Sequence, residues 1–150
     1  MASLEAQIQI YSSIEEVFDF LARSENFLKI IPPELKVQVV AAPERLTLGS
    51  RFEVQIAGFG VPQKVIYEVT NFAEPNAFTE AQVQGPLGRY VQEHVISQQS
   101  DGTVLVTDRV EFEPPGGFLG LLLSADRLRT SLDQGLAYRH RELKRLLEGT

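Results

Sequence analysis

The sequence predicts an α+β domain in which a curved, seven-stranded antiparallel sheet wraps around one long C-terminal helix. Strand-like alternation of apolar and polar residues, broken by short turn-forming segments, fills the chain from residue 35 to 113. One further strand-like run and two short helical patterns precede it, and a long leucine stripe at helical spacing follows it. The 150 residues show no linker or repeat, so we expect one domain spanning 1–150.

The N-terminal segment predicts a strand followed by a capped helix. The apolar residues Leu4, Ala6, Ile8 and Ile10 alternate with polar ones, as expected for a strand with one buried face. Two serine–glutamate pairs, Ser12 with Glu15 and Ser13 with Glu16, have the spacing of a capping box. Apolar residues at helical intervals follow, so a short helix begins at one of the two serines.

A second short helix is predicted after the first. Ser24 is placed to cap it, and Phe27, Leu28 and Ile31 supply its apolar positions. Pro32 and Pro33 end it, because proline removes a backbone donor and restricts the residue before it.

Six further strands are predicted at 35–42, 50–57, 62–72, 77–84, 89–99 and 103–113. Their connections are short and rich in Gly, Pro, Asn and Asp, which is typical of an antiparallel meander. In the last connection, Gly102 suits the left-handed position of a three-residue turn.

That three-residue turn predicts the register of the last two strands. It pairs Gln99 with Thr103, which places His94 opposite Asp108 and Glu93 opposite Arg109. A two-residue turn would instead place His94 opposite Arg109. The first register pairs opposite charges across the strands, which is favourable, so it is preferred.

The C-terminal helix is predicted from Ala125 to Leu147. Its apolar stripe comprises Leu128, Leu132, Leu136, Leu143 and Leu147, and Gly149 stands where a helix stop belongs. Residues 119–123 form either its first turns or a separate entry segment. Gly135 and Ala125 leave room beside the stripe. His140 lies among charged residues and is expected to face solvent.

Composition excludes several classes of protein. The chain has no cysteine, which excludes disulfide frameworks, zinc ribbons and thiol catalysis, and it has only two histidines. Its net charge of -6 disfavours nucleic-acid partners. Neither a secretory signal nor an apolar run of about twenty residues is present, so we expect a cytoplasmic protein, with transient membrane contact left open. We expect no cofactor or metal, and a monomer or a homodimer.

Four segments resemble motifs of the START-like, birch-pollen-allergen-like superfamily, also called SRPBCC or polyketide cyclase/dehydrase-like. Residues 82–90 (QVQGPLGRY) resemble Q-x-x-G-P-F-x-x-W, with Leu87 and Tyr90 as replacements. Gln92 and His94 resemble H-x-H, with Gln92 in place of the first histidine. Residues 102–115 resemble G-T-x-x-x-D-x-V-x-Y-x-x-P, and residues 118–120 with 138–139 resemble the final-helix signature.

The resemblance covers the whole chain and implies a helix-grip fold with a groove between the sheet and the last helix. It places Glu80 and Gln82 on the groove side of their strand, where alternation alone is ambiguous because Ala77, Ala81 and Val83 would make the opposite face apolar. The residues expected to contact a ligand are Phe78, Glu80, Gln82, Tyr90, Gln92, His94, Asp108, Val110, Phe112, Leu128, Leu132 and Arg139. Phe52, Val54, Ile56 and Leu136 extend the expected apolar lining.

Three functions follow from this set. The first is non-enzymatic binding of a small, largely hydrophobic molecule such as a lipid, polyketide or aromatic, its polar end meeting His94, Gln82, Gln92 or Tyr90. The second is a cyclase, dehydratase or hydrolase, with His94 as general base oriented by Asp108. The third is a protein-interaction module of the chaperone-activator type, which requires a filled interior. Arg139 is expected to pair with a buried carboxylate, Glu80 or Asp108, in preference to a ligand acid.

Overall fold

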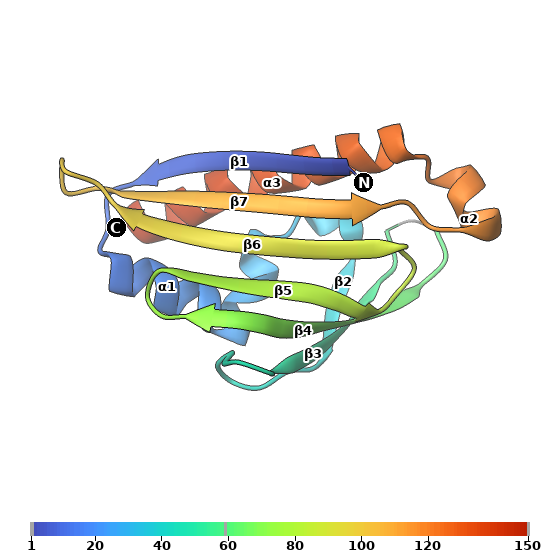
Figure 1. The fold of residues 1–150 in the computed structure, drawn as a ribbon, viewed down its shortest axis with the longest axis horizontal. Helices are drawn as coiled ribbons and strands as arrows, with labels where there is room; N and C mark the ends of the chain where they lie inside the picture. Colours follow the sequence, from blue (N-terminus) through green and yellow to red (C-terminus); the bar gives the residue numbers. More distant parts are fainter. Residues whose placement is uncertain (1, 59, 150) are drawn as a thin grey trace.

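The computed structural model describes residues 2–58 and 60–149. In chain order the elements are β1 (Ala2–Ile10), α1 (Ile14–Ala22), the 3₁₀ helices η1 (Ser24–Ile30) and η2 (Pro33–Leu35), β2 (Val37–Ala41), β3 (Arg51–Ile56), β4 (Gln63–Ala73), β5 (Ala77–Gln84), β6 (Arg89–Gln98), β7 (Val104–Glu113), α2 (Gly117–Leu122) and α3 (Ala125–Glu148). Figure 1 shows the sheet as one layer with α3 running behind it, and α2 at the end where β7 finishes.

The seven strands form a single antiparallel sheet in the order β1-β7-β6-β5-β4-β3-β2. The predicted register of β6 and β7 is confirmed, because His94 pairs with Asp108 and Glu93 with Arg109. The predicted turn is also confirmed. Gln99 donates its N–H to the Thr103 carbonyl, and Gly102 has a positive φ of 85°.

The helix α1 begins directly after one of the two serines predicted to cap it. Ser13 is the N-cap, and its hydroxyl accepts the backbone N–H of Glu16.

The prediction that Ser24 caps the second helix was wrong. Ser24 is the first residue of the 3₁₀ helix η1, and its hydroxyl donates to the Pro43 carbonyl. The helix also ends at Ile30, one residue before Ile31.

The C-terminal helix spans Ala125–Glu148, with Ser124 as its N-cap and Gly149 as its C-cap. The segment before it is a separate helix, α2, which settles the alternative left open by the sequence. In the described part of the chain, none of the helices combines the length and the apolar character that a membrane crossing needs.

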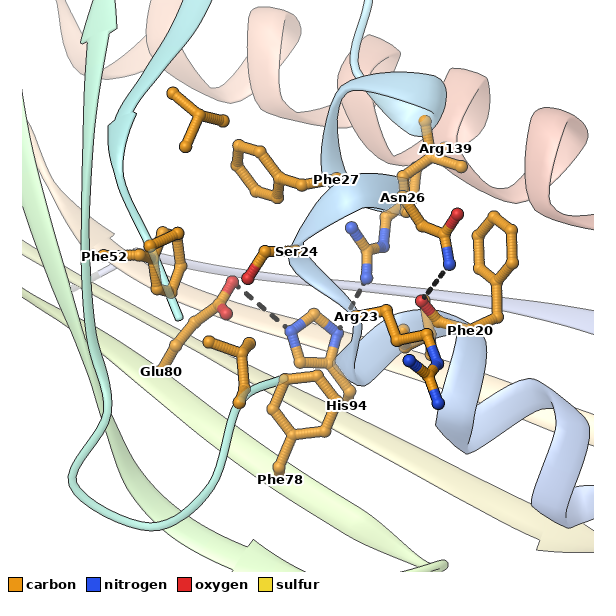
Figure 2. A pocket seen from close by; sticks show the side chains of 15 residues that line it. Phe20, Arg23, Ser24, Asn26, Phe27, Phe52, Phe78, Glu80, His94 and Arg139 are labelled. Atoms are coloured by element: carbon orange, nitrogen blue, oxygen red, sulfur yellow. Dashed lines mark hydrogen bonds and ion pairs between the residues drawn. The ribbon is translucent and has the colours of Figure 1, made fainter. Parts of the chain in front are cut away.

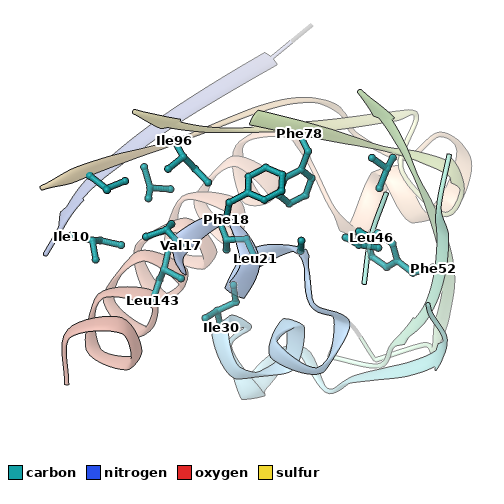
Figure 3. Packing of buried hydrophobic residues seen from close by; sticks show 14 of the residues in the cluster. Ile10, Val17, Phe18, Leu21, Ile30, Leu46, Phe52, Phe78, Ile96 and Leu143 are labelled. Atoms are coloured by element: carbon teal, nitrogen blue, oxygen red, sulfur yellow. The ribbon is translucent and has the colours of Figure 1, made fainter. Parts of the chain in front are cut away.

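The apolar core consists of two clusters along α3. The larger cluster packs α1 against the sheet around Phe18, Phe78 and Leu143 (Figure 3). The smaller cluster contains Val110, Phe112, Leu128 and Leu136, near the start of α3. The larger cluster closes one end of the groove, and the sheet, α2 and the first half of α3 surround the other end.

Candidate functional site

A cavity of about 190 Å³ lies between the sheet and the first half of α3. Its walls come from η1, η2, all strands from β2 to β7, the connection between β5 and β6, α2 and α3. Most of the lining is apolar and includes Val54, Ile56, Val65, Val110, Leu128, Leu132 and Leu136. Gly135 also lines it, and a Cβ atom at this position would meet nothing within 4 Å apart from its own helix backbone and its chain neighbours. Ala125 is exposed at the start of the helix, so Gly135 alone of the two leaves room in the groove.

A fully buried carboxylate, Asp108, organises a polar cluster beside this cavity. Its Oδ1 atom lies 2.5 Å from Nδ1 of His94, and its Oδ2 atom lies 2.5 Å from Nε2 of His140. Gln92 donates its amide N–H to Oδ1 at 3.2 Å. The guanidinium Nε of Arg139 lies 3.5 Å from Oδ2. A carboxylate only accepts hydrogen bonds, so both ring nitrogens facing Asp108 carry protons.

The prediction that His140 faces solvent was wrong. The side chain is 4% exposed and holds Asp108 from the α3 side. His140 follows Leu136 by four residues and precedes Leu143 by three, so it continues the buried stripe. This spacing was the signal that could have placed it inside.

The charges in the cluster shift its pKa values in opposite directions. Burial raises the pKa of Asp108, but the positive charges of Arg139 and His94 and the hydrogen bonds from both histidines hold it well below its usual value. Burial lowers the pKa of His94, but the carboxylates of Asp108 and Glu80 outweigh burial and the Arg139 charge, so the pKa is raised. The cluster therefore stabilises the ionised form of Asp108 and, relative to a free imidazole, the cationic form of His94.

The far side of His94 faces a second, smaller chamber of about 30 Å³. Nε2 of His94 lies 3.4 Å from Oε1 of Glu80, without a hydrogen bond, and the ring packs on Phe78 with centroids 4.4 Å apart. Figure 2 shows Glu80 and Arg139 on opposite sides of the imidazole. Arg139 Nη2 approaches Nδ1 of His94 at 3.2 Å, but that nitrogen already donates to Asp108. Glu80 and Arg139 line both chambers.

Two of the predicted polar contacts are already engaged within the protein. The Gln82 amide donates to the Leu87 carbonyl at 2.8 Å and accepts the Leu87 N–H at 3.4 Å, which ties β5 to the β5–β6 connection. The Gln92 amide accepts the Tyr90 hydroxyl at 2.5 Å and donates to Asp108. Both amides line the cavity, but their hydrogen bonds serve to position other groups.

The structure distributes the predicted ligand contacts over three places. The large cavity is lined by Glu80, Gln82, Tyr90, Gln92, Val110, Leu128, Leu132 and Arg139. Phe78 and His94 line the small chamber, as does Phe52 from the expected apolar lining. Asp108 and Phe112 line neither: Asp108 lies behind His94 and Gln92, and Phe112 is enclosed in the smaller core cluster. The groove-facing orientation of Glu80 and Gln82 agrees with the resemblance.

Several cavity residues were missing from the predicted set, and Tyr67 is the one that adds an aromatic ring with a hydroxyl. Tyr67 on β4 stacks on Phe52 with ring centroids 5.0 Å apart and lines the large cavity. Burial, with the nearby Glu80 charge, raises the pKa of its phenol. Tyr67 alternates with Val65 and Val69 on the apolar face of its strand, and this periodicity could have placed it in the groove.

The cluster does not offer an evident metal site. Across residues 2–58 and 60–149, no three His, Asp or Glu side chains are grouped as metal ligands. The Asp108 oxygens already accept hydrogen bonds from both histidines, which leaves the cluster arranged as an ion pair network.

Comparison with known proteins supports one family. The family model described as polyketide cyclase/dehydrase and lipid transport matches residues 1–148. Among curated proteins, none matches the sequence.

Several solved structures share the fold at low sequence identity. A START superfamily protein from Mycobacterium smegmatis is 15% identical, with a TM-score of 0.72 over 98% of this chain and 97% of that one. The major latex-like protein 151 from Panax ginseng is 16% identical, with a TM-score of 0.69 over 97% of each chain. The protein TTHA0849 from Thermus thermophilus is 17% identical, with a TM-score of 0.65 over 95% of this chain and 97% of that one.

Proposed function

The chain belongs to the polyketide cyclase/dehydrase and lipid transport family, and from this premise we propose that it binds one small, largely hydrophobic molecule in the cavity between the sheet and α3. The protein holds this molecule without converting it. Apolar burial provides most of the affinity, and the polar end of the cavity sets the orientation.

The cavity itself carries this proposal. Its volume of about 190 Å³ exceeds that of a dry engineered cavity of about 150 Å³ that binds benzene, so a molecule of one or two rings fits. The walls are rigid strands and a long helix, which keeps the space open between the two core clusters. An open apolar interior also argues against the interaction-module alternative, because that function requires a filled interior.

The geometry favours binding over general-base catalysis by His94. The ring is 1% exposed and lines only the small chamber, so a ligand in the large cavity does not meet it directly. Its Nδ1 donates to Asp108 and its Nε2 lies 3.4 Å from Oε1 of Glu80, so both ring nitrogens face carboxylates of the protein.

Native mass spectrometry of the full chain with 2-methylnaphthalene tests the proposal. This probe is apolar and carries no hydrogen-bonding group, so it reports on the cavity alone. We expect one molecule bound per chain, and loss of the adduct when the protein is unfolded by acid. An adduct of several molecules, or none at all at the solubility limit of the probe, would contradict the proposed function.

A further inference from the structure

Glu80 is a buried carboxylate that lacks the hydrogen bonds such a group requires. The residue is 8% exposed, and a carboxylate can accept about four hydrogen bonds. Within the described residues, its one ionic contact is Nε2 of His94, at 3.4 Å and without hydrogen-bond geometry. Burying a charge with so few partners is costly, so a donor from outside the chain is expected to complete its environment.

The phenol of Tyr67 lies near this carboxylate on the same cavity wall. Tyr67 pairs with Gln82 across β4 and β5, which makes Glu80 a diagonal neighbour two residues along β5. Both side chains line the large cavity. In the described structure the Tyr67 hydroxyl has no hydrogen-bond partner, in contrast to Tyr90, whose hydroxyl donates to Gln92.

Aromatic rings surround the space next to these two groups. Phe52 and Tyr67 are stacked at an interplanar angle of 29°, and Tyr90 meets Tyr67 edge to face at 5.9 Å. Phe27 packs against Phe52 from η1. Planar ligands stack favourably on such rings, whereas flexible alkyl chains gain only from the apolar area that they bury.

The charges around the cavity are already balanced without a ligand. The carboxylates of Glu80 and Asp108 face the guanidinium of Arg139 and the imidazole of His94. A ligand anion would approach the unpaired side of Glu80, and a ligand cation would approach Arg139 across the same cavity. A neutral molecule avoids both repulsions.

We propose that the cavity selects an uncharged aromatic alcohol, with its hydroxyl donating to Glu80 and hydrogen-bonded to Tyr67. This inference rests on the proposed function and names the class of ligand that the same site takes. The ring system lies against Phe27, Tyr67 and Tyr90, and the remaining apolar surface contacts the leucines of α3. Gln82, Gln92 and His94, which the sequence suggested as polar anchors, position the walls of the site instead.

Calorimetric titration with four probes of one ring system tests the proposal. The probes are 2-naphthol, 2-methylnaphthalene, 2-naphthoate and 2-naphthylmethylammonium. We expect 2-naphthol to bind about tenfold to a hundredfold more tightly than 2-methylnaphthalene, since a hydrogen bond to a buried charged acceptor is worth that much. Both charged probes should bind more weakly than 2-naphthol.

Two variants assign the preference to named groups. Glu80→Gln keeps the shape and removes the charge, and Tyr67→Phe removes only the phenol oxygen. Each should lower the ratio of 2-naphthol affinity to 2-methylnaphthalene affinity severalfold. Glu93→Gln, on the outer side of β6, is the matched control and should change neither affinity. If Glu80→Gln does not fold, Tyr67→Phe still tests whether the preference for 2-naphthol depends on this site.

The outcomes separate the two proposals. Equal affinity for 2-naphthol and 2-methylnaphthalene overturns the hydroxyl preference but leaves the binding function standing. Tightest binding of 2-naphthoate overturns it in favour of Arg139 as the anchor, and tightest binding of the ammonium probe overturns the argument from charge balance. If none of the four binds, both the ligand class and the proposed function fall.

Discussion

Asp108 is the residue on which most of the buried polar structure depends. It joins β7 to β6 through His94 and Gln92, and to α3 through His140 and Arg139. Each of these groups is buried or nearly so, which means that none can turn to water if its partner is lost. Ion pairs of this kind add little net stability but are expensive to break.

Replacing Asp108 by Asn is therefore expected to destabilise the protein strongly. The change leaves the Arg139 and His94 charges buried beside a neutral amide, at a cost of about 3–5 kcal/mol in the free energy of unfolding. Urea denaturation followed by circular dichroism measures this loss. Glu113→Gln, an exposed carboxylate on the same strand, should change stability by no more than about 0.5 kcal/mol. Similar losses in the two variants would contradict this role of Asp108.

The same cluster predicts how stability depends on pH. The pKa of Asp108 is held well below its ordinary value of 3.8, so its contribution is present above that pH and is lost as pH falls further. The pKa of His94 is raised from 6.5, so its contribution is present below pH 6.5 and is lost as pH rises through the raised value. The groups facing His94 are Asp108, Glu80 and Arg139.

We therefore expect the free energy of unfolding to be highest between about pH 4 and 6.5, as the opposite shifts of Asp108 and His94 require. Urea titrations across pH 3 to 9 measure the profile. In His94→Gln the decline on the alkaline side should become shallower, because one titrating group has been removed. An unchanged alkaline slope in that variant would show that His94 is not a source of the decline.

Residue pairs were predictable from sequence where a short turn determined them. Gly102 defined the turn, and the opposite charges of Glu93 and Arg109 selected the register that pairs His94 with Asp108. The contact of Asp108 with His140 was not predictable in this way, because it joins two elements with no local connection. The charged neighbours of His140 pointed to solvent, although its spacing from Leu136 and Leu143 pointed to the core.

Among the single elements, β5 is tied to the connection that follows it by one of its own side chains. The Gln82 amide forms both of its hydrogen bonds with the backbone of Leu87, and Leu87 lines the cavity. These two hydrogen bonds are a physical reason why a glutamine, Gln82, stands three residues before Gly85-Pro86. The amide acts as a backbone partner for a turn that has few of its own.

Replacing Gln82 by Met should loosen this connection while preserving the bulk of the side chain. We expect faster amide hydrogen exchange at Leu87 and a loss of about 1–2 kcal/mol in stability, since two partly buried hydrogen bonds disappear. Amide hydrogen exchange in β1 and β7 should be as slow as in the wild-type protein. Unchanged exchange at Leu87 would mean that the loop is held by other contacts.

Element boundaries were predictable when the capping partner was near in sequence. Ser13 and Ser124 cap α1 and α3 through backbone groups three residues away. Ser24 has the same chemistry, but its hydroxyl donates to Pro43, which the fold brings near from nineteen positions along the chain. Local patterns contain no information about such a partner.

At the scale of the whole molecule, the sheet and α3 meet fully only at one end. The larger core cluster fills the space beneath α1, whereas beside the first half of α3 the side chains leave a cavity of about 190 Å³. The sequence predicted the groove from the order of the elements and from Gly135. It could not predict the volume, which depends on how η1, η2 and α2 close over the sheet.

If this cavity is the binding site, filling it from α3 should abolish binding. A leucine at Gly135 would extend into the cavity without meeting another atom at its Cβ position. Ala137→Leu adds a similar apolar side chain to the exposed face of the same helix and serves as the control. Gly135→Leu should also keep or raise the stability, by up to about 1 kcal/mol, because glycine is a poor helix former.

The measurement is calorimetric titration of 2-methylnaphthalene into the wild-type chain and both variants. We expect binding to be lost or weakened at least tenfold in Gly135→Leu and to be unchanged in Ala137→Leu, with both variants folded. Undiminished binding by a folded Gly135→Leu protein would contradict it, because the probe would then occupy another place on the molecule.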